Sequence, residues 1–241
     1  PDDLSTFPTR QHAWNDALTT DEHGNHVPPR HHVLVFLDYA GSGTPDDTDR
    51  EQVEAAFRNL ERAYQRGSEG LLFTAGYSPS YFQRYDAALP DSARLQEPRA
   101  LTDLEDPELD QQDAVVHLAS DYAQVVLGAE EALLGNRDAL NGVDIETDVS
   151  GVLEKADRRT GFIGDGLPAE NQDVVGIPDS EPVPEDAPMY MGFESGFEKN
   201  QASEDRVTIP DGPFAGGTNQ QLSKIRLQLQ QWYEQDSREQ R

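Results

Sequence analysis

Two polar residues enclosed by glycines are the first candidates for chemistry in this sequence. Glu194 and Ser195 lie in the turn Gly192-Phe193-Glu194-Ser195-Gly196, where a carboxylate and a hydroxyl could move a proton or hydrogen-bond to a ligand. The turn opens the stretch 191–232, which continues through an acidic, amide-rich loop and a second glycine-rich turn into an alternating segment. This layout is typical of a ligand-facing loop that precedes a strand.

Histidines are the second set of candidates, because a neutral imidazole is the commonest metal ligand in proteins. Five of the six lie close together near the start of the sequence: His12, His23, His26, His31 and His32. They do not recur at a helical spacing with acidic partners, so we predict solvated loop histidines and no metal site. The sixth, His117, stands alone in an apolar run and is predicted to be a hydrogen-bonded structural residue.

The charge of the chain limits its classes of partner. Asp and Glu number 46 against 19 Lys and Arg, which gives a formal net charge of −27. Such an excess repels nucleic acids and anionic membranes, so we expect neither as a partner. The acids are spread along the sequence and lysine is rare, a composition typical of salt-loving organisms, where dense salt screens the repulsion. An acidic mesophilic protein with a disordered tail is the alternative.

Other absences narrow the chemistry further. The sequence has no cysteine, which excludes disulfides, thiolate nucleophiles, iron–sulfur clusters and cysteine-ligated zinc. No apolar run approaches the roughly 20 residues of a membrane span. Because the sequence begins with Pro1, we expect that a preceding segment has been removed. A cleaved export signal would make the protein extracellular or part of the cell envelope.

The elements that must position these residues follow from the hydrophobic pattern. Four runs of β-branched, aromatic or alternating residues predict strands at 32–39, 70–77, 114–119 and 143–149. Apolar residues at helical spacing predict one helix that starts at Thr48 and ends before Gly67, and another from Tyr122 to Gly135. The order β-α-β-β-α-β predicts an α+β fold with one ferredoxin-like domain over residues 31–150.

Three further parts surround this domain. Residues 1–30 form a polar N-terminal extension, and residues 151–188 are predicted to be an irregular connection rich in proline and turn formers. Residues 189–241 contain the glycine-flanked loop and then the alternating segment Leu222–Leu229. That segment predicts the first strand of a second, incomplete ferredoxin-like domain.

Several motifs resemble the dye-decolourising (DyP-type) haem peroxidases, whose fold is two ferredoxin-like domains in a dimeric α/β-barrel arrangement. The motifs are HHVLVFLDYAG, LLFTAGYSPSYFQRYD, LEDPELDQQDAVVHLASDYAQVV and GGTNQQLSKIRLQLQQW. The likeness covers most of residues 31–235, with scattered identity. The sequences RQHAWN, RRTGFIGDGLPAE and KNQASEDRVTIPDGPFAGGT are more similar to a haloarchaeal offshoot of that superfamily, of uncharacterised function, than to a standard member.

The resemblance implies a haem site at the glycine-flanked turn. Family members carry Gly-Xaa-Xaa-Asp-Gly, whose aspartate moves protons during peroxide cleavage, and here Ser195 stands at the aspartate position beside Glu194. The resemblance also implies haem contacts from Gly192, Phe193, Gly196, Asn200 and Arg226. A hydroxyl is a far weaker base than a carboxylate, so we expect haem binding with little peroxidase activity. A competing register at 161–166 contains an aspartate but inserts one residue.

The rest of such a pocket is expected from elsewhere. The family's iron-ligating histidine and distal arginine would fall beyond Arg241, so we expect a C-terminal fragment or a homo-oligomer to complete the fold. The alternative function is a non-catalytic structural or interaction protein of the cell envelope that uses the same scaffold. Metal binding by His23, His26, His31 and His32 stays open as a third alternative.

Overall fold

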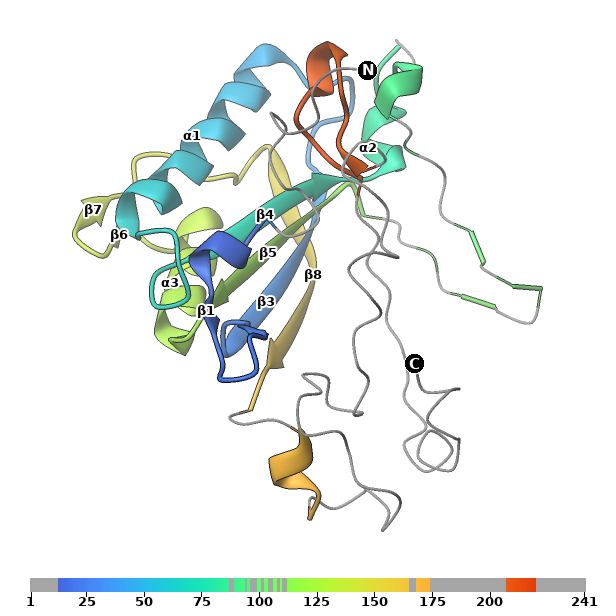
Figure 1. The fold of residues 1–241 in the computed structure, drawn as a ribbon. Coiled ribbons are helices and arrows are strands. Elements are labelled where there is room, and N and C mark those ends of the chain that lie inside the picture. Colours follow the sequence, from blue (N-terminus) through green and yellow to red (C-terminus); the bar gives the residue numbers. More distant parts are fainter. Residues whose placement is uncertain are drawn as a thin grey trace.

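The centre of the molecule is a four-stranded antiparallel sheet with helices α1 and α3 on one face (Figure 1). The computed structural model describes residues 13–86, 112–164, 168–173 and 207–219, with parts of 89–109. In chain order the central elements are β3 (His31–Tyr39), α1 (Asp47–Ala63), β4 (Leu72–Tyr77), β5 (Ala114–Ser120), α3 (Ala123–Leu133) and β8 (Leu153–Phe162). The strand order is β4-β5-β3-β8. This β-α-β-β-α-β arrangement confirms the predicted α+β, ferredoxin-like fold class.

Shorter elements flank the sheet. The hairpin of β1 (Thr19–Thr20) and β2 (His26–Val27) precedes it, α2 (Pro79–Phe82) follows β4, and the hairpin of β6 (Ala139–Leu140) and β7 (Val143–Asp144) follows α3. Short 3₁₀ helices lie at Asn15–Ala17, Asp91–Ala93, Pro168–Asn171 and Gly212–Phe214. In the described part of the chain, no helix is long and apolar enough to cross a membrane.

Two carboxylates fix the start of α1. The Asp46 side chain accepts hydrogen bonds from the N–H groups of Thr48 and Asp49, and the Asp49 carboxylate accepts one from the Asp46 N–H. This capping box satisfies free amides of the first turn and puts negative charge at the positive end of the helix dipole. The sequence prediction starts this helix at Thr48, whereas the cap is Asp46 and the first helical residue is Asp47.

The core lies between the sheet and the two helices. Alternate side chains of the central strands point toward the helices. The buried ones are Val33, Val35 and Leu37 of β3, and Val116 and Leu118 of β5. Leu60 of α1 and Leu133 of α3 pack in the same cluster and are 1% exposed. This burial of apolar surface is what holds the helices on one face of the sheet.

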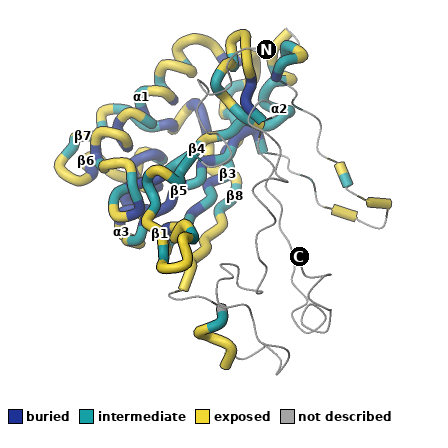
Figure 2. The backbone as a smooth tube through the Cα atoms, in the orientation of Figure 1, coloured by how far each residue is buried: buried dark blue, intermediate teal, exposed yellow. Residues whose placement is uncertain are grey.

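The other face of the sheet carries neither α1 nor α3 (Figure 1). Its central side chains are His32, Leu34 and Phe36 of β3, and Val115 and His117 of β5. All five are half-buried, whereas their neighbours in β3 and β5 on the helix side are buried (Figure 2). We refer to these five residues as the open face.

The fourth strand of the sheet lies later in the chain than predicted. The predicted strand at 143–149 is wrong, because only Val143–Asp144 is a strand and it pairs with Ala139–Leu140. The turn between them is Asn141-Gly142, with φ of 49° and 80°, the pair of positive φ values that a two-residue hairpin turn requires. The turn therefore closes a short hairpin, and the alternating segment does not extend the main sheet.

The strand β8 takes the edge position instead, within residues predicted to be an irregular connection. It pairs antiparallel with β3, and the register shifts between Phe36 and Leu37, which leaves Ala156 as an extra residue. This β-bulge interrupts the alternation of apolar and polar side chains, so periodicity does not reveal the strand. The division of residues 163–241 into a connection and a second domain stays a prediction, because 174–206 and 220–241 lie outside the described residues.

Candidate functional site

The loop predicted to carry the chemistry lies outside the described residues. This applies to all the predicted site residues: Glu194, Ser195, Gly192, Phe193, Gly196, Asn200 and Arg226. Their roles stay predictions. From the stretch 191–232 the structure describes residues 207–219, which include the predicted turn Gly216-Gly217.

Residues 207–219 form a loop beside α2 (Figure 1). The loop closes on itself, because the N–H of Gly216 donates to the carbonyl of Ile209 at 2.9 Å. Gly216 has a φ of 82°, a backbone conformation that favours glycine. The rings of Phe214 and Phe82 meet edge-on, with centroids 5.4 Å apart. The structure thus brings the glycine turn next to the helical turn after β4, two motifs that are distant in sequence.

A buried carboxylate joins the ends of β3, β4 and β5 in the same region. Asp113 directly precedes β5 and is 2% exposed. It accepts hydrogen bonds from the Tyr39 N–H at 2.9 Å and the Ser80 hydroxyl at 2.9 Å, and it forms an ion pair with Arg84 at 2.7 Å. Burial raises the pKa of Asp113, but the three donors together outweigh burial and hold the pKa below its usual range. The carboxylate is charged and bound on both oxygens, which makes its role structural.

Four tyrosines lie close to this carboxylate: Tyr39, Tyr77, Tyr81 and Tyr85. The ring of Tyr81 is at the centre, 4.5 Å from Tyr77, 5.8 Å from Tyr85 and 6.5 Å from Tyr39 between centroids. The Tyr39 hydroxyl donates to Asp49 at 2.6 Å, which raises the pKa of Tyr39 to about 12. Burial raises the pKa of Tyr81. Both phenols stay protonated at neutral pH, so they act as hydrogen-bond donors and not as bases.

A pair of histidines lies on the open face. His32 Nδ1 is 3.0 Å from His117 Nε2, and His32 Nε2 is 2.6 Å from the carbonyl oxygen of Pro29. A carbonyl only accepts, so Nε2 of His32 carries a proton and its Nδ1 accepts from His117. The Trp14 ring lies 5.0 Å from the His117 ring. The prediction of a hydrogen-bonded His117 is therefore confirmed, whereas His32 is not the solvated loop residue that the sequence predicts.

The surroundings of the pair favour neutral rings. Burial lowers the pKa of His32, even though the bond to Pro29 opposes this change. Burial, and to a smaller extent the charge of His32, lower the pKa of His117 to about 4. At neutral pH both imidazoles are therefore uncharged, and each keeps a nitrogen lone pair.

We expect the free energy of unfolding to fall as the pH is lowered from 7 to 4. The unfolded chain protonates His117 near the ordinary value of 6.5, whereas the folded chain does so only near pH 4, so protons bind the unfolded state preferentially between these values. The linkage corresponds to about 3 kcal/mol at pH 4, and we expect about 2 because the ring is only half-buried. Urea denaturation at several pH values measures this slope.

The control for this pH dependence is the exposed His26. The variant His117→Gln is expected to flatten the slope between pH 4 and 6.5, while His26→Gln keeps the slope of the wild type. An equal slope in wild type and His117→Gln would show that other groups cause the acid sensitivity.

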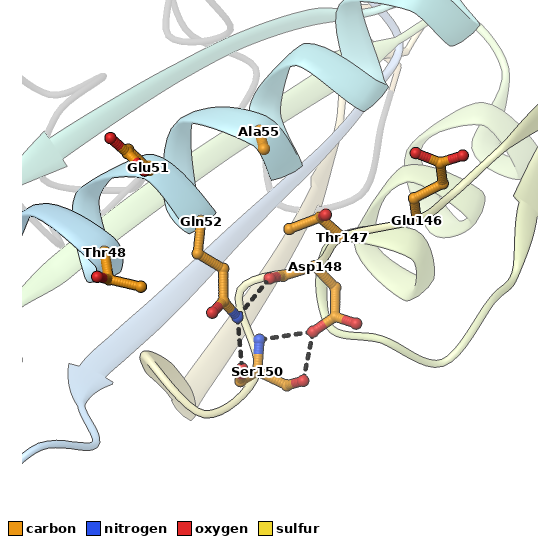
Figure 3. A pocket seen from close by; sticks show the side chains of 8 residues that line it. All are labelled: Thr48, Glu51, Gln52, Ala55, Glu146, Thr147, Asp148 and Ser150. Atoms are coloured by element: carbon orange, nitrogen blue, oxygen red, sulfur yellow. Dashed lines mark hydrogen bonds between the residues drawn. The ribbon is translucent and has the colours of Figure 1, made fainter.

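An open hollow of about 510 Å³ lies between α1 and the loop after β7 (Figure 3). Its lining residues are Thr48, Glu51, Gln52 and Ala55 of α1, and Glu146, Thr147, Asp148 and Ser150 of the loop. The Gln52 amide donates to the carbonyls of Asp148 at 3.0 Å and Ser150 at 2.9 Å, and the Asp148 carboxylate accepts from the Ser150 N–H at 2.7 Å. The Gln52 amide therefore fixes the loop after β7 against α1, which makes these contacts structural.

On the open face His32 uses both ring nitrogens in hydrogen bonds, and His117 uses its Nε2. Haem iron needs an axial donor such as His, Met, Cys or Tyr. The two imidazoles there bond to each other and to a carbonyl, and the described residues contain no group of three or more His, Asp or Glu that could hold a metal ion. The apolar side chains of Leu34, Phe36 and Val115 could pack against a flat apolar ligand. These residues carry no group that takes part in iron chemistry.

Sequence reasoning did not single out Trp14, Asp113 or Arg84. Asp113 lies 29 positions from Arg84 and 74 positions from Tyr39, so no local pattern marks their contacts. The one available signal is an aspartate directly before an apolar strand, which places a carboxylate at the end of the sheet. Trp14 lies in the segment predicted to be a polar extension, yet its ring packs on His117.

Solved structures that are similar to this chain include three dye-decolorizing proteins at low identity. The dye-decolorizing protein from Vibrio cholerae is 14% identical with a TM-score of 0.46, over 84% of this chain and 55% of that chain. DyPB from Rhodococcus jostii RHA1 is 14% identical with a TM-score of 0.40, over 76% of this chain and 47% of that chain. The encapsulated DyP-type peroxidase from Mycobacterium smegmatis is 14% identical with a TM-score of 0.43, over 70% of this chain and 48% of that chain. This chain spans about half the length of these proteins, and the values are too low for any conclusion about activity.

Sequence comparison places the chain in a family without giving it a function. No curated protein matches the sequence. One family model, described as "Family of unknown function (DUF7405)", matches residues 29–241. The match includes the whole central sheet and the stretch 191–232. The chain therefore belongs to the DUF7405 family.

Proposed function

We propose that this protein binds haem, or a similar flat and largely apolar ligand, on a DyP-like scaffold. The observation that carries the proposal is the open face, where Leu34, Phe36 and Val115 lie half-buried on a side of the sheet that neither α1 nor α3 covers. Covering such side chains with an apolar surface is favourable by roughly 25 cal/mol per Å². The motifs that resemble the DyP-type peroxidases support haem as the ligand. Its axial donor would come from a residue outside the described part or from a partner chain.

The open face can be tested by adding a charge to it. The variant Leu34→Glu is expected to weaken binding of haemin to the full chain by about tenfold or more, because the ligand would bury an unpaired carboxylate. The matched control is Phe162→Glu at the end of β8, where the side chain is 81% exposed and lies off this face. Absorption titrations give both affinities, and circular dichroism verifies the fold. Equal affinities for Leu34→Glu and wild type would exclude the open face as the site.

Peroxidase turnover by the wild type is expected to be weak. The resemblance puts Ser195 where the family has an aspartate, and a serine hydroxyl does not take up a proton at neutral pH. The proposed role of Ser195 is therefore limited to a hydrogen bond.

The variant Ser195→Asp is expected to raise the peroxidase kcat/KM of the haem-loaded full chain by about tenfold to hundredfold. A carboxylate at this position can take a proton from one peroxide oxygen and return it to the other, and such catalysis typically contributes 10²–10⁴-fold. Ser195→Asn is the matched control, because asparagine has nearly the same size as aspartate but its amide does not act as a base. A wild type that already turns over as fast as Ser195→Asp would contradict the role given to this position.

A second candidate function is a non-catalytic structural or interaction protein of the cell envelope. It is favoured by the observation that His32 and His117 bond to each other, a contact that holds this part of the open face together without haem. In that case the open face contacts another protein surface, such as a second copy of the chain, and haemin does not bind. Sedimentation velocity of the full chain distinguishes the two: a dimer that Leu34→Glu dissociates supports this candidate.

We also propose a high-salt environment outside the cell or in the cell envelope. The net charge of −27 supports the high-salt part of this proposal, because dense salt screens the repulsion among so many carboxylates. A melting temperature that does not rise between low salt and molar KCl would count against the halophilic part of this proposal. Detection of the natural protein in the cytoplasm would count against its location.

A further inference from the structure

The histidine pair on the open face supports an inference that does not depend on haem. Nδ1 of His32 on β3 and Nε2 of His117 on β5 face each other at 3.0 Å. Two facing nitrogens repel each other unless a positive centre lies between their lone pairs. A proton on His117 fills this place in the hydrogen-bonded form, and a metal ion could take the same place.

The separation of the two nitrogens is close to that of two ligands of one metal ion. Zinc binds imidazole nitrogen at about 2.0–2.1 Å, so two nitrogens at a tetrahedral angle lie about 3.3 Å apart. The ring centroids are 5.2 Å apart, so the two nitrogens face each other nearly head-on. The pair would have to open by about 0.3 Å, and both rings would have to turn so that their lone pairs converge on one ion. The β-sheet holds both backbones in place, since Leu34 and His117 are paired residues of adjacent strands.

The surroundings of His32 prepare it for metal binding. Its Nε2 donates to the carbonyl of Pro29 at 2.6 Å, and Pro29 is fully buried. Metal-ligating histidines almost always donate their second N–H to a carboxylate, a carbonyl or water, which fixes the tautomer and the direction of the ring.

The donor set selects the class of ion. Imidazole suits zinc, copper and nickel, whereas calcium and magnesium take oxygen ligands. The described residues supply no third His, Asp or Glu to this group, so its other coordination positions are open to water or an outside ligand. The net charge of −27 attracts cations to the protein surface. We propose that His32 and His117 form a binding site for a divalent transition metal ion, zinc or copper.

Trp14 provides a built-in reporter for this site. Its ring lies 5.0 Å from the His117 ring, and the sequence contains only one further tryptophan, Trp232. A bound copper ion at this distance quenches indole fluorescence. Titration of the full chain with CuCl₂ in a buffer without chelators therefore reports binding by calorimetry and by fluorescence in the same sample.

We expect the wild type to bind one copper ion per chain at this site with loss of Trp14 emission. His117→Gln and His32→Gln are expected to weaken this binding at least tenfold. His31→Gln, which changes the adjacent histidine of the same strand, is the matched control and should bind as the wild type does. Trp14→Phe should keep the affinity and lose most of the quenching.

Equal affinity of the wild type and His117→Gln would overturn the proposal and assign the binding to exposed histidines such as His23 and His26. A second measurement uses only the wild type, so its result does not depend on whether the variants fold. One equivalent of ZnCl₂ should shift the ¹⁵N resonances of the His32 and His117 rings together, and unchanged ring resonances would overturn the proposal as well.

Discussion

Replacing Arg158 with alanine is expected to lower the free energy of unfolding by about 2–3 kcal/mol, because its side chain is 32% exposed and water screens part of its ion pair with Glu130. Glu130 of α3 is 6% exposed, and its carboxylate accepts three hydrogen bonds of 2.7–2.9 Å from the guanidinium of Arg158 on β8. Without the guanidinium, the buried carboxylate of Glu130 has lost its charged partner. The ion pair also ties the edge strand to the helix layer, so we expect the loss to be greatest at β8.

Two further variants test whether the loss of stability comes from leaving the carboxylate of Glu130 buried without a partner. Arg58→Ala breaks an exposed pair on α1, whose Arg58 and Glu54 side chains are 67% and 55% exposed, and should lower stability by less than about 0.5 kcal/mol. The double variant Glu130→Leu with Arg158→Met removes both charges and should recover most of the loss. Urea denaturation measures all three. An effect of Arg158→Ala no larger than that of Arg58→Ala would contradict the buried ion pair.

The second large effect is expected at Asp113. Asp113→Ala should lower the free energy of unfolding by about 3 kcal/mol, because the Tyr39 N–H, the Ser80 hydroxyl and the Arg84 guanidinium lose their acceptor together. Tyr39 ends β3, Ser80 lies in α2 and Arg84 follows α2, so the contact between the strand ends and α2 weakens as well. Thermal and urea unfolding measure the loss.

The charge of Asp113 makes this effect depend on pH. Its pKa is held below the ordinary value of 3.8, so the contribution to stability is present above about pH 4 and is lost as the pH falls through the lowered pKa. Asp113→Asn should remove this acid dependence. Asp138→Ala, at an exposed position after α3, is the control and should change stability by less than about 0.5 kcal/mol. Equal losses for Asp113→Ala and Asp138→Ala would contradict the hydrogen-bond network.

Most of the central fold could be predicted from local patterns. Three predicted strands correspond to β3, β4 and β5, because apolar runs bounded by proline and glycine are visible without knowledge of their partners. The helices α1 and α3 follow from apolar residues at helical spacing. The edge strand β8 was missed, since the bulge at Ala156 changes which side chains face the helices and Arg158 occupies an inward position.

The arrangement around the open face could not be predicted in the same way. The contact of His32 with His117 spans 85 positions, and the contact of Trp14 with His117 spans more. Such pairs depend on the register between β3 and β5, which is set by the whole apolar face and not by the residues that meet. A histidine at the start of a predicted strand can therefore form a hydrogen bond that the sequence pattern does not show.

Haem binding by the intact chain is most directly tested by titration with haemin, followed by absorption in the Soret region. We expect a Soret band of protein-bound haem that saturates at one haemin per chain. The titration should be repeated in molar KCl, since the charge of −27 favours the folded chain in high salt. A spectrum that stays that of free haemin at both salt concentrations would contradict haem binding and leave the interaction protein as the function of this fold.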